Sequence, residues 1–168
     1  MPIDTNLSVT TYQNADGSNL STAGVENKMK VGNATFGTYT GVGTNFGNNS
    51  DFSAIIDFKG SMPYGNSNIS GAFRIRNNLG ENKQTVQLRF QPANINIPLN
   101  DKVNLYADPY VAMKIDYNSG KQNTNVGIFG GASVKVNKAS IFVEGQLYDV
   151  TNIKNESVSF NVGISIPL

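Results

Sequence analysis

Apolar and polar positions alternate across residues 52–59, FSAIIDFK, residues 69–76, ISGAFRIR, and residues 85–90, TVQLRF. Ile55 and Ala72 are the two apolar residues that stand at polar positions. The charged residues of these stretches all stand at the polar positions. Successive side chains of a β-strand point to opposite faces, so the pattern places apolar side chains on one face and polar side chains on the other. It predicts strands with one apolar and one polar face, and the next question is which face is inside.

Segments of the same kind recur along the whole chain, and none has the 3.6-residue period of an amphipathic helix. Clusters of Asn, Gly, Ser and Asp separate them, and such residues favour tight turns. Short turns join antiparallel neighbours, because parallel pairing needs long crossover connections. We therefore expect ten antiparallel strands at 5–13, 20–31, 34–46, 51–62, 67–77, 83–92, 102–117, 124–136, 139–149 and 157–168.

An open meander of ten strands would leave two unpaired edges, whereas a closed ring pairs the first strand with the last. The sequence thus predicts an all-β fold, a closed up-and-down barrel in a single domain covering residues 1–168. The first segment is weakly apolar around Leu7 and Val9, so eight strands with an N-terminal arm is the alternative. Pro109 cannot donate a hydrogen bond to a neighbouring strand, and it predicts a bulge or a late strand start.

Composition narrows the function. The net charge of +1 offers no field that would attract nucleic acid. The chain has no cysteine and no histidine, which excludes thiolate and histidine catalysis and their metal sites. We expect no enzymatic activity and no cofactor. No apolar run is long enough for a membrane helix, and no signal peptide opens the chain, so an exported form would already have lost it.

A water-soluble barrel buries its apolar side chains, while a membrane barrel turns them to lipid and keeps a polar lumen. The apolar run from Val103 to Tyr117 is long enough for a tilted membrane strand. Aromatic residues of the apolar face gather near strand ends, and those of the polar face suggest a packed lumen. The transmembrane barrel is therefore favoured. The alternative is a soluble barrel that binds an apolar ligand between Phe58, Phe73, Leu88, Phe90 and Met113.

The C-terminal strand adds a resemblance. Asn161, Gly163, Ile166 and Leu168 follow a polar-x-Gly-x-x-hydrophobic-x-hydrophobic pattern. This pattern resembles the terminal signal of small bacterial outer-membrane β-barrels, although Leu168 stands where such chains typically end on an aromatic residue. The resemblance implies a lipid bilayer as surroundings, the outer membrane as location, the barrel assembly machinery as a partner of this strand, periplasmic termini and a monomer.

The polar face supplies a charged set with a slight excess of positive charge. A ten-stranded barrel is only slightly wider than one that side chains fill, so long cations paired with acids would largely plug the lumen. That reading gives the barrel a structural or surface-interaction role. The other reading is a narrow path that favours small anions. The predicted lumenal charges are Glu26, Lys28, Lys30, Asp57, Lys59, Arg74, Arg76, Arg89, Asp108, Lys114, Asp116, Lys135 and Glu144.

Overall fold

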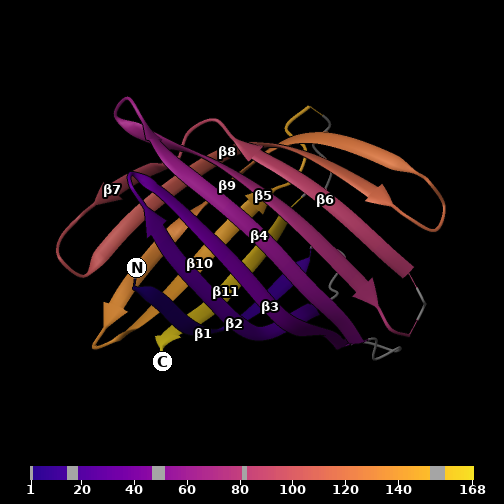
Figure 1. Cartoon of the computed structure of the whole chain (residues 1–168), viewed down its shortest axis with the longest axis horizontal. Helices are drawn as coiled ribbons and strands as arrows, with labels where there is room; N and C mark the ends of the chain where they lie inside the picture. The colour runs from indigo at the N-terminus through magenta and orange to yellow at the C-terminus, as the bar shows by residue number, and fades with distance from the viewer. Residues whose placement is uncertain (1, 15–18, 47–51, 81–82, 152–157) are drawn as a thin grey trace.

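A computed structural model describes residues 2–14, 19–46, 52–80, 83–151 and 158–168 (Figure 1). No helix long and apolar enough to cross a bilayer occurs among these residues. The strands are β1 (Ile3–Asn14), β2 (Asn19–Val31), β3 (Ala34–Phe46), β4 (Phe52–Tyr64), β5 (Ser67–Asn78), β6 (Lys83–Gln91), β7 (Ile95–Pro98), β8 (Val103–Asp116), β9 (Gln122–Val136), β10 (Ala139–Leu147) and β11 (Val158–Pro167).

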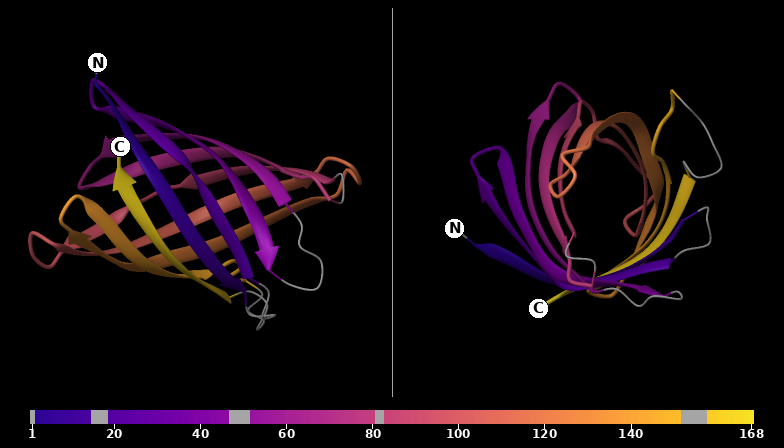
Figure 2. Two further views of the ribbon diagram at one scale, coloured as in Figure 1. Left: turned by 90° about the horizontal axis from the view of Figure 1, so that it is seen from below. Right: turned by 90° about the vertical axis from the view of Figure 1, so that its right-hand side faces the viewer.

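Ten of these strands form a closed antiparallel ring. Each of the ten pairs with the next ring strand along the chain, so β6 pairs with β8. The short β7, which lies between them in the sequence, pairs with another part of β8. The ring closes where β1 pairs with β11, from Asn6 opposite Pro167 to Asn14 opposite Ser159. The view along the barrel shows the closed wall (Figure 2). The predicted ten-stranded barrel is confirmed, and the weakly apolar first segment is a strand of the ring.

The prediction missed β7 and misplaced the bulge. Phe90 lies opposite Val111, but Ile95 lies opposite Ala107, so five steps along one strand match four along β8. The extra residue therefore belongs to the segment between β6 and β7, which contains Pro92. Pro109 stays in a continuous β8, and its missing N–H faces the interrupted part of the partner strand.

The two rims of the barrel differ. The rim that holds both termini has the short connections 32–33, 65–66, 99–102 and 137–138, and we call it the terminal rim. Gly32, Gly65 and Asn137 have positive φ at the first central position of a two-residue turn, as a type II′ turn requires. The opposite rim, the loop rim, carries connections 15–18, 47–51, 79–82, 117–121 and 148–157. Of the connections between the predicted strands, residues 15–18, 47–50 and 81–82 lie outside the described residues.

The apolar faces of the strands point outward. Phe58, Leu88 and Phe90 are 51%, 45% and 51% exposed. Phe73 lies opposite both Phe58 and Leu88, and Met113 lies opposite Leu88, so these two belong to the same outer face. The five residues therefore cannot surround an internal ligand, as the soluble alternative requires. Strands of 9–15 residues with an apolar outer face match the surroundings of a lipid bilayer.

Glycines on the inner wall leave room for aromatic rings and for tightly curved backbone. A Cβ on Gly41 would lie 2.5 Å from the Tyr39 hydroxyl, and one on Gly127 would overlap the Tyr110 ring. A Cβ on Gly131 would overlap the Val143 carbonyl oxygen and lie 2.8 Å from the Cα of Glu144. Glycine at these inner-wall positions therefore allows the close packing of rings and backbone.

The Gly131→Ala variant is expected to lose about 2 kcal/mol of unfolding free energy, because the neighbouring backbone of β10 would have to move. Urea unfolding in detergent micelles, followed by far-UV circular dichroism, measures the loss. Gly145→Ala is the matched control on the adjacent strand, since its Cβ would meet only the Phe160 ring at 3.7 Å. Equal stability of the two variants would contradict the packing argument.

Candidate functional site

The lumen is the candidate site, and its middle is closely packed. Register places one polar residue of each strand at the same depth as its neighbours, and several are almost inaccessible to solvent. Most of these side chains are neutral, and several form hydrogen bonds with one another or with charged residues. The least exposed of the described polar side chains are Ser53, Asp57, Tyr110, Ser159 and Asn161, each at most 2% exposed.

The strongest contact in the lumen joins β4 to β5. Arg74 donates from Nε and Nη2 to the two carboxylate oxygens of Asp57, at 2.7 Å each. The Asp57 side chain is 3% exposed and that of Arg74 is 39% exposed. Two parallel charge-assisted hydrogen bonds fix both side chains against the wall. The pair forms between adjacent strands and does not span the lumen.

The other two arginines have uncharged partners. Arg76 donates from Nε to the Ser53 hydroxyl at 3.0 Å. The Arg89 guanidinium lies 4.7 Å from the centre of the Tyr110 ring and 5.6 Å from that of Phe129. Such stacking stabilises a cation without a counter-charge. All three arginines of the chain thus lie on the inner face of two neighbouring strands, β5 and β6.

Acidic groups gather on another part of the wall. Glu144 accepts hydrogen bonds from Asn161 Nδ2 at 2.7 Å and from the Tyr106 hydroxyl at 3.1 Å. Asp108 is 9% exposed and interacts with Asn94 and the backbone of Ile95, at the bulge between β6 and β7. Neither carboxylate forms an ion pair within 4 Å among the described residues, so both are held by neutral groups.

The remaining predicted charges lie toward the rims. Glu26 pairs with Lys28 at 3.0 Å and with Lys59 at 3.3 Å, on the part of the wall near the terminal rim. Asp116 accepts from the backbone N–H groups of Asn118 and Ser119 in its own turn. Its other carboxylate oxygen lies 3.7 Å from Lys83, which the sequence analysis did not include. Within the described part of the chain, Lys30, Lys114 and Lys135 form no ion pair within 4 Å.

Gln146 and Ser159 are uncharged members of the lining that the sequence analysis did not include, and each bonds to a tyrosine of the predicted polar face. Gln146 donates to the Tyr110 hydroxyl at 2.7 Å, and the Ser159 hydroxyl donates to that of Tyr148 at 3.2 Å. These residues occupy inward positions of the same alternation that identified the charges. A prediction that included every polar residue at an inward position, and not the charged residues alone, would have identified them.

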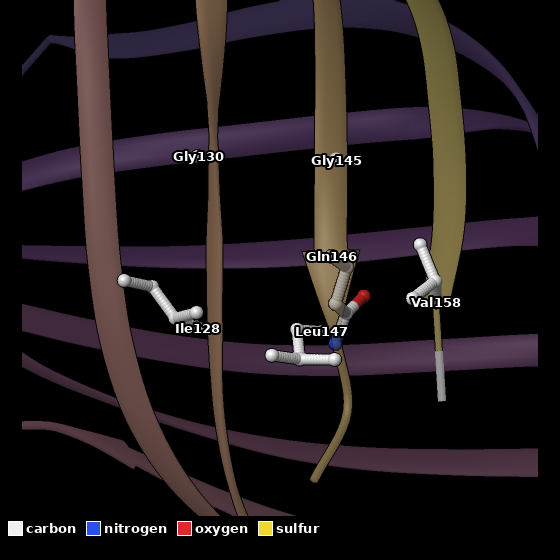
Figure 3. Close-up of a pocket in the computed structure, with 6 residues that line it drawn as sticks. All are labelled: Ile128, Gly130, Gly145, Gln146, Leu147 and Val158. Carbon is white, nitrogen blue, oxygen red and sulfur yellow. The ribbon is translucent and has the colours of Figure 1, made fainter. Parts of the chain in front are cut away.

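Two shallow depressions lie on the outer wall. One is formed where Gly130 and Gly145 face each other on β9 and β10, and the side chains of Ile128, Leu147 and Val158 surround it (Figure 3). The other lies between β1, β2 and β11, beside Phe160 and Val162. Both face the bilayer. The described residues contain no cluster of three acids that would hold a metal ion.

No protein-family model matches the chain, and no curated protein matches it. Solved structures are similar in fold. The translocator domain of the autotransporter NalP from Neisseria meningitidis is 14% identical with a TM-score of 0.51, over 99% of this chain and 87% of that one. A structure described as a de novo designed transmembrane β-barrel is 11% identical with a TM-score of 0.47, over 100% and 98%.

OmpT, an outer-membrane protein of Vibrio cholerae, is 12% identical with a TM-score of 0.43. The match covers 96% of this chain and 64% of OmpT, so this chain spans less than two thirds of that protein. The closed register, the outward apolar face and the likeness to NalP agree with the resemblance seen in the C-terminal strand. The chain has the fold of an outer-membrane β-barrel.

Proposed function

We propose that this protein is a small outer-membrane barrel whose lumen is filled by side chains, with a structural or surface-interaction role. The observation that supports it most directly is the inaccessible middle of the lumen, where Tyr110 is 1% exposed and Asp57 is 2% exposed. A water-filled channel at this depth would leave such side chains wet. The proposal includes no catalysis, since the chain has neither histidine nor cysteine.

The two rims support an orientation. Outer-membrane barrels have short periplasmic turns and longer extracellular loops. The terminal rim has the short turns, so the proposal places both termini in the periplasm and the longer connections outside. The connection 148–157 is the longest of that set. A surface-interaction role would use this rim.

The proposal also includes assembly as a monomer, with β11 as the strand that the assembly machinery recognises. Asn161 and Gly163 of β11 face the lumen, while Ile164 and Ile166 face outward. Three residues of the pattern noted in the sequence, Asn161, Gly163 and Ile166, thus lie on one continuous strand, and Leu168 follows directly after it. Its outer side chains would be available to a partner before the ring closes.

Single-channel recording in a planar bilayer tests the filled lumen. The wild-type protein is expected to give no discrete current steps above a blank made of the same lipid. Tyr110→Ala is the matched variant, because it removes the largest inaccessible side chain of the lumen. Small steps from this variant would show that the middle is the barrier. Reproducible steps from the wild type would contradict the proposal and favour the narrow pore.

A further inference from the structure

Four cations lie on one side of the inner wall, and we call this set the patch. Arg76 and Lys114 are each two residues from the loop-rim end of their strands, while Arg74 and Arg89 lie nearer the middle of the lumen. Arg74 lies opposite Gln87, and Gln87 lies opposite Lys114, so a single row crosses β5, β6 and β8. Arg76 is two residues from Arg74, and Arg89 is two residues from Gln87, both on the same inner face. Neighbouring strands are about 4.8 Å apart and alternate residues about 7 Å apart, so each of these cations lies within about 10 Å of another one of the set.

Only one of the four charges is neutralised by a contact. Asp57 pairs with Arg74. Arg76 has the Ser53 hydroxyl, Arg89 has two ring faces, and Lys114 has no carboxylate within 4 Å in the part of the chain that the structure describes. Three positive charges therefore lie together without a counter-charge in contact.

The cations are close enough to repel one another. Arg74 and Arg76 are two residues apart on one face of β5, and Lys114 lies in the same row as Arg74, two strands away. Repulsion is stronger in a partly desolvated lumen than in bulk water. A bound anion would relieve this repulsion, so the arrangement of the cations favours anion binding.

Several N–H donors of these cations have no partner within the described part of the chain. Arg76 uses Nε for Ser53, and its two terminal nitrogens have no partner among the described residues. The Arg89 guanidinium lies over two aromatic rings, and its N–H groups form no hydrogen bond with the residues that the structure describes. Arginine forks match the oxygen spacing of phosphate and carboxylate groups, and lysine adds a point charge. The Lys114 side chain is exposed, so the patch is accessible to solvent.

We propose that Arg76, Arg89 and Lys114 form a binding site for a small, doubly charged oxyanion of the phosphate class, entering from the loop rim. The ligand is water-soluble, because the site faces the lumen and lipid headgroups contact the outer wall. The site does not require conduction, since an anion can enter from one rim and leave by it. A non-conducting barrel that binds phosphate fits both proposals, and the two can fail separately.

The experiment is isothermal titration of the whole barrel, folded in non-ionic detergent micelles, with sodium phosphate at constant ionic strength. Sodium chloride is the reference titrant, because chloride is an anion that carries a single charge and has no oxygen atoms for the arginine forks to bind. The wild type is expected to bind phosphate measurably and chloride not. Arg76→Gln and Lys114→Gln should each weaken phosphate binding roughly tenfold or more, since each removes charge-assisted hydrogen bonds.

Lys28→Gln is the matched control, because Lys28 is a lumenal lysine near the other rim that already pairs with Glu26. It should bind phosphate as the wild type does. A second readout separates binding from folding: in chloride alone, Lys114→Gln should be at least as stable as the wild type, because it relieves repulsion. Wild-type affinity in both patch variants, an equal loss in Lys28→Gln, or no preference for phosphate over chloride would each overturn the inference.

Discussion

The Phe73→Arg variant is expected to lose about 3 kcal/mol of unfolding free energy in lipid or detergent. Phe73 lies near the middle of β5, on the outer face, with its ring 6.4 Å from that of Phe58. An arginine on the lipid face near the bilayer midplane costs about 2–4 kcal/mol, and the aromatic contact is also lost. Urea unfolding of the barrel in lipid vesicles measures the difference.

Asn77→Arg is the matched control for this variant. Asn77 lies on the same face of the same strand but next to its end, at the loop rim. The cost of an outward arginine falls to about 0–1 kcal/mol near the membrane interface. If the two variants lost equal stability, depth in the bilayer would not be the cause. If Phe73→Arg were as stable as the wild type, the outer face would not be in contact with lipid.

The Asp57→Ala variant is also expected to lose about 3 kcal/mol. It leaves Arg74 without its carboxylate partner, next to two other arginines. Breaking a buried ion pair costs about 3–5 kcal/mol, and the partial exposure of Arg74 brings the expectation toward the lower end. Denaturant unfolding in detergent micelles gives the value.

The double variant Asp57→Ala, Arg74→Met tests the cause. It removes the stranded charge while keeping a side chain of similar length, so it should recover at least about 1 kcal/mol of the loss. No recovery would mean that the loss comes from the cavity left by Asp57. Far-UV circular dichroism of each variant establishes that the barrel still forms.

Alternation predicted the fold well because each face of a barrel strand meets one environment. The segments 34–46 and 83–92 show this, since their strands begin and end within a residue of the prediction. The four residues of β7 were missed for a physical reason. They follow a bulge that contains Pro92, and an inserted residue breaks the two-residue period on which the prediction depends.

The lumen was less predictable than the wall. Inward position follows from the period alone, so Arg74, Arg76 and Arg89 could be placed on the polar face. Their partners follow from register, which no single strand encodes. Asp116 shows the difference: it occupies an inward position, yet its carboxylate holds its own turn and contacts Lys83.

The bulge between β6 and β7 has a consequence for the strength of the wall. The join of the chain ends, β1 with β11, is held by nine residue pairs. Within the described residues, β6 and β8 share only six, followed by a break and then the four pairs of β7. Pro92 and Pro109 both lie at that break, and neither can donate a backbone hydrogen bond. This line therefore consists of two short runs of pairs where the joined ends form one unbroken run of nine, so we expect strand separation under lateral tension to begin at the break.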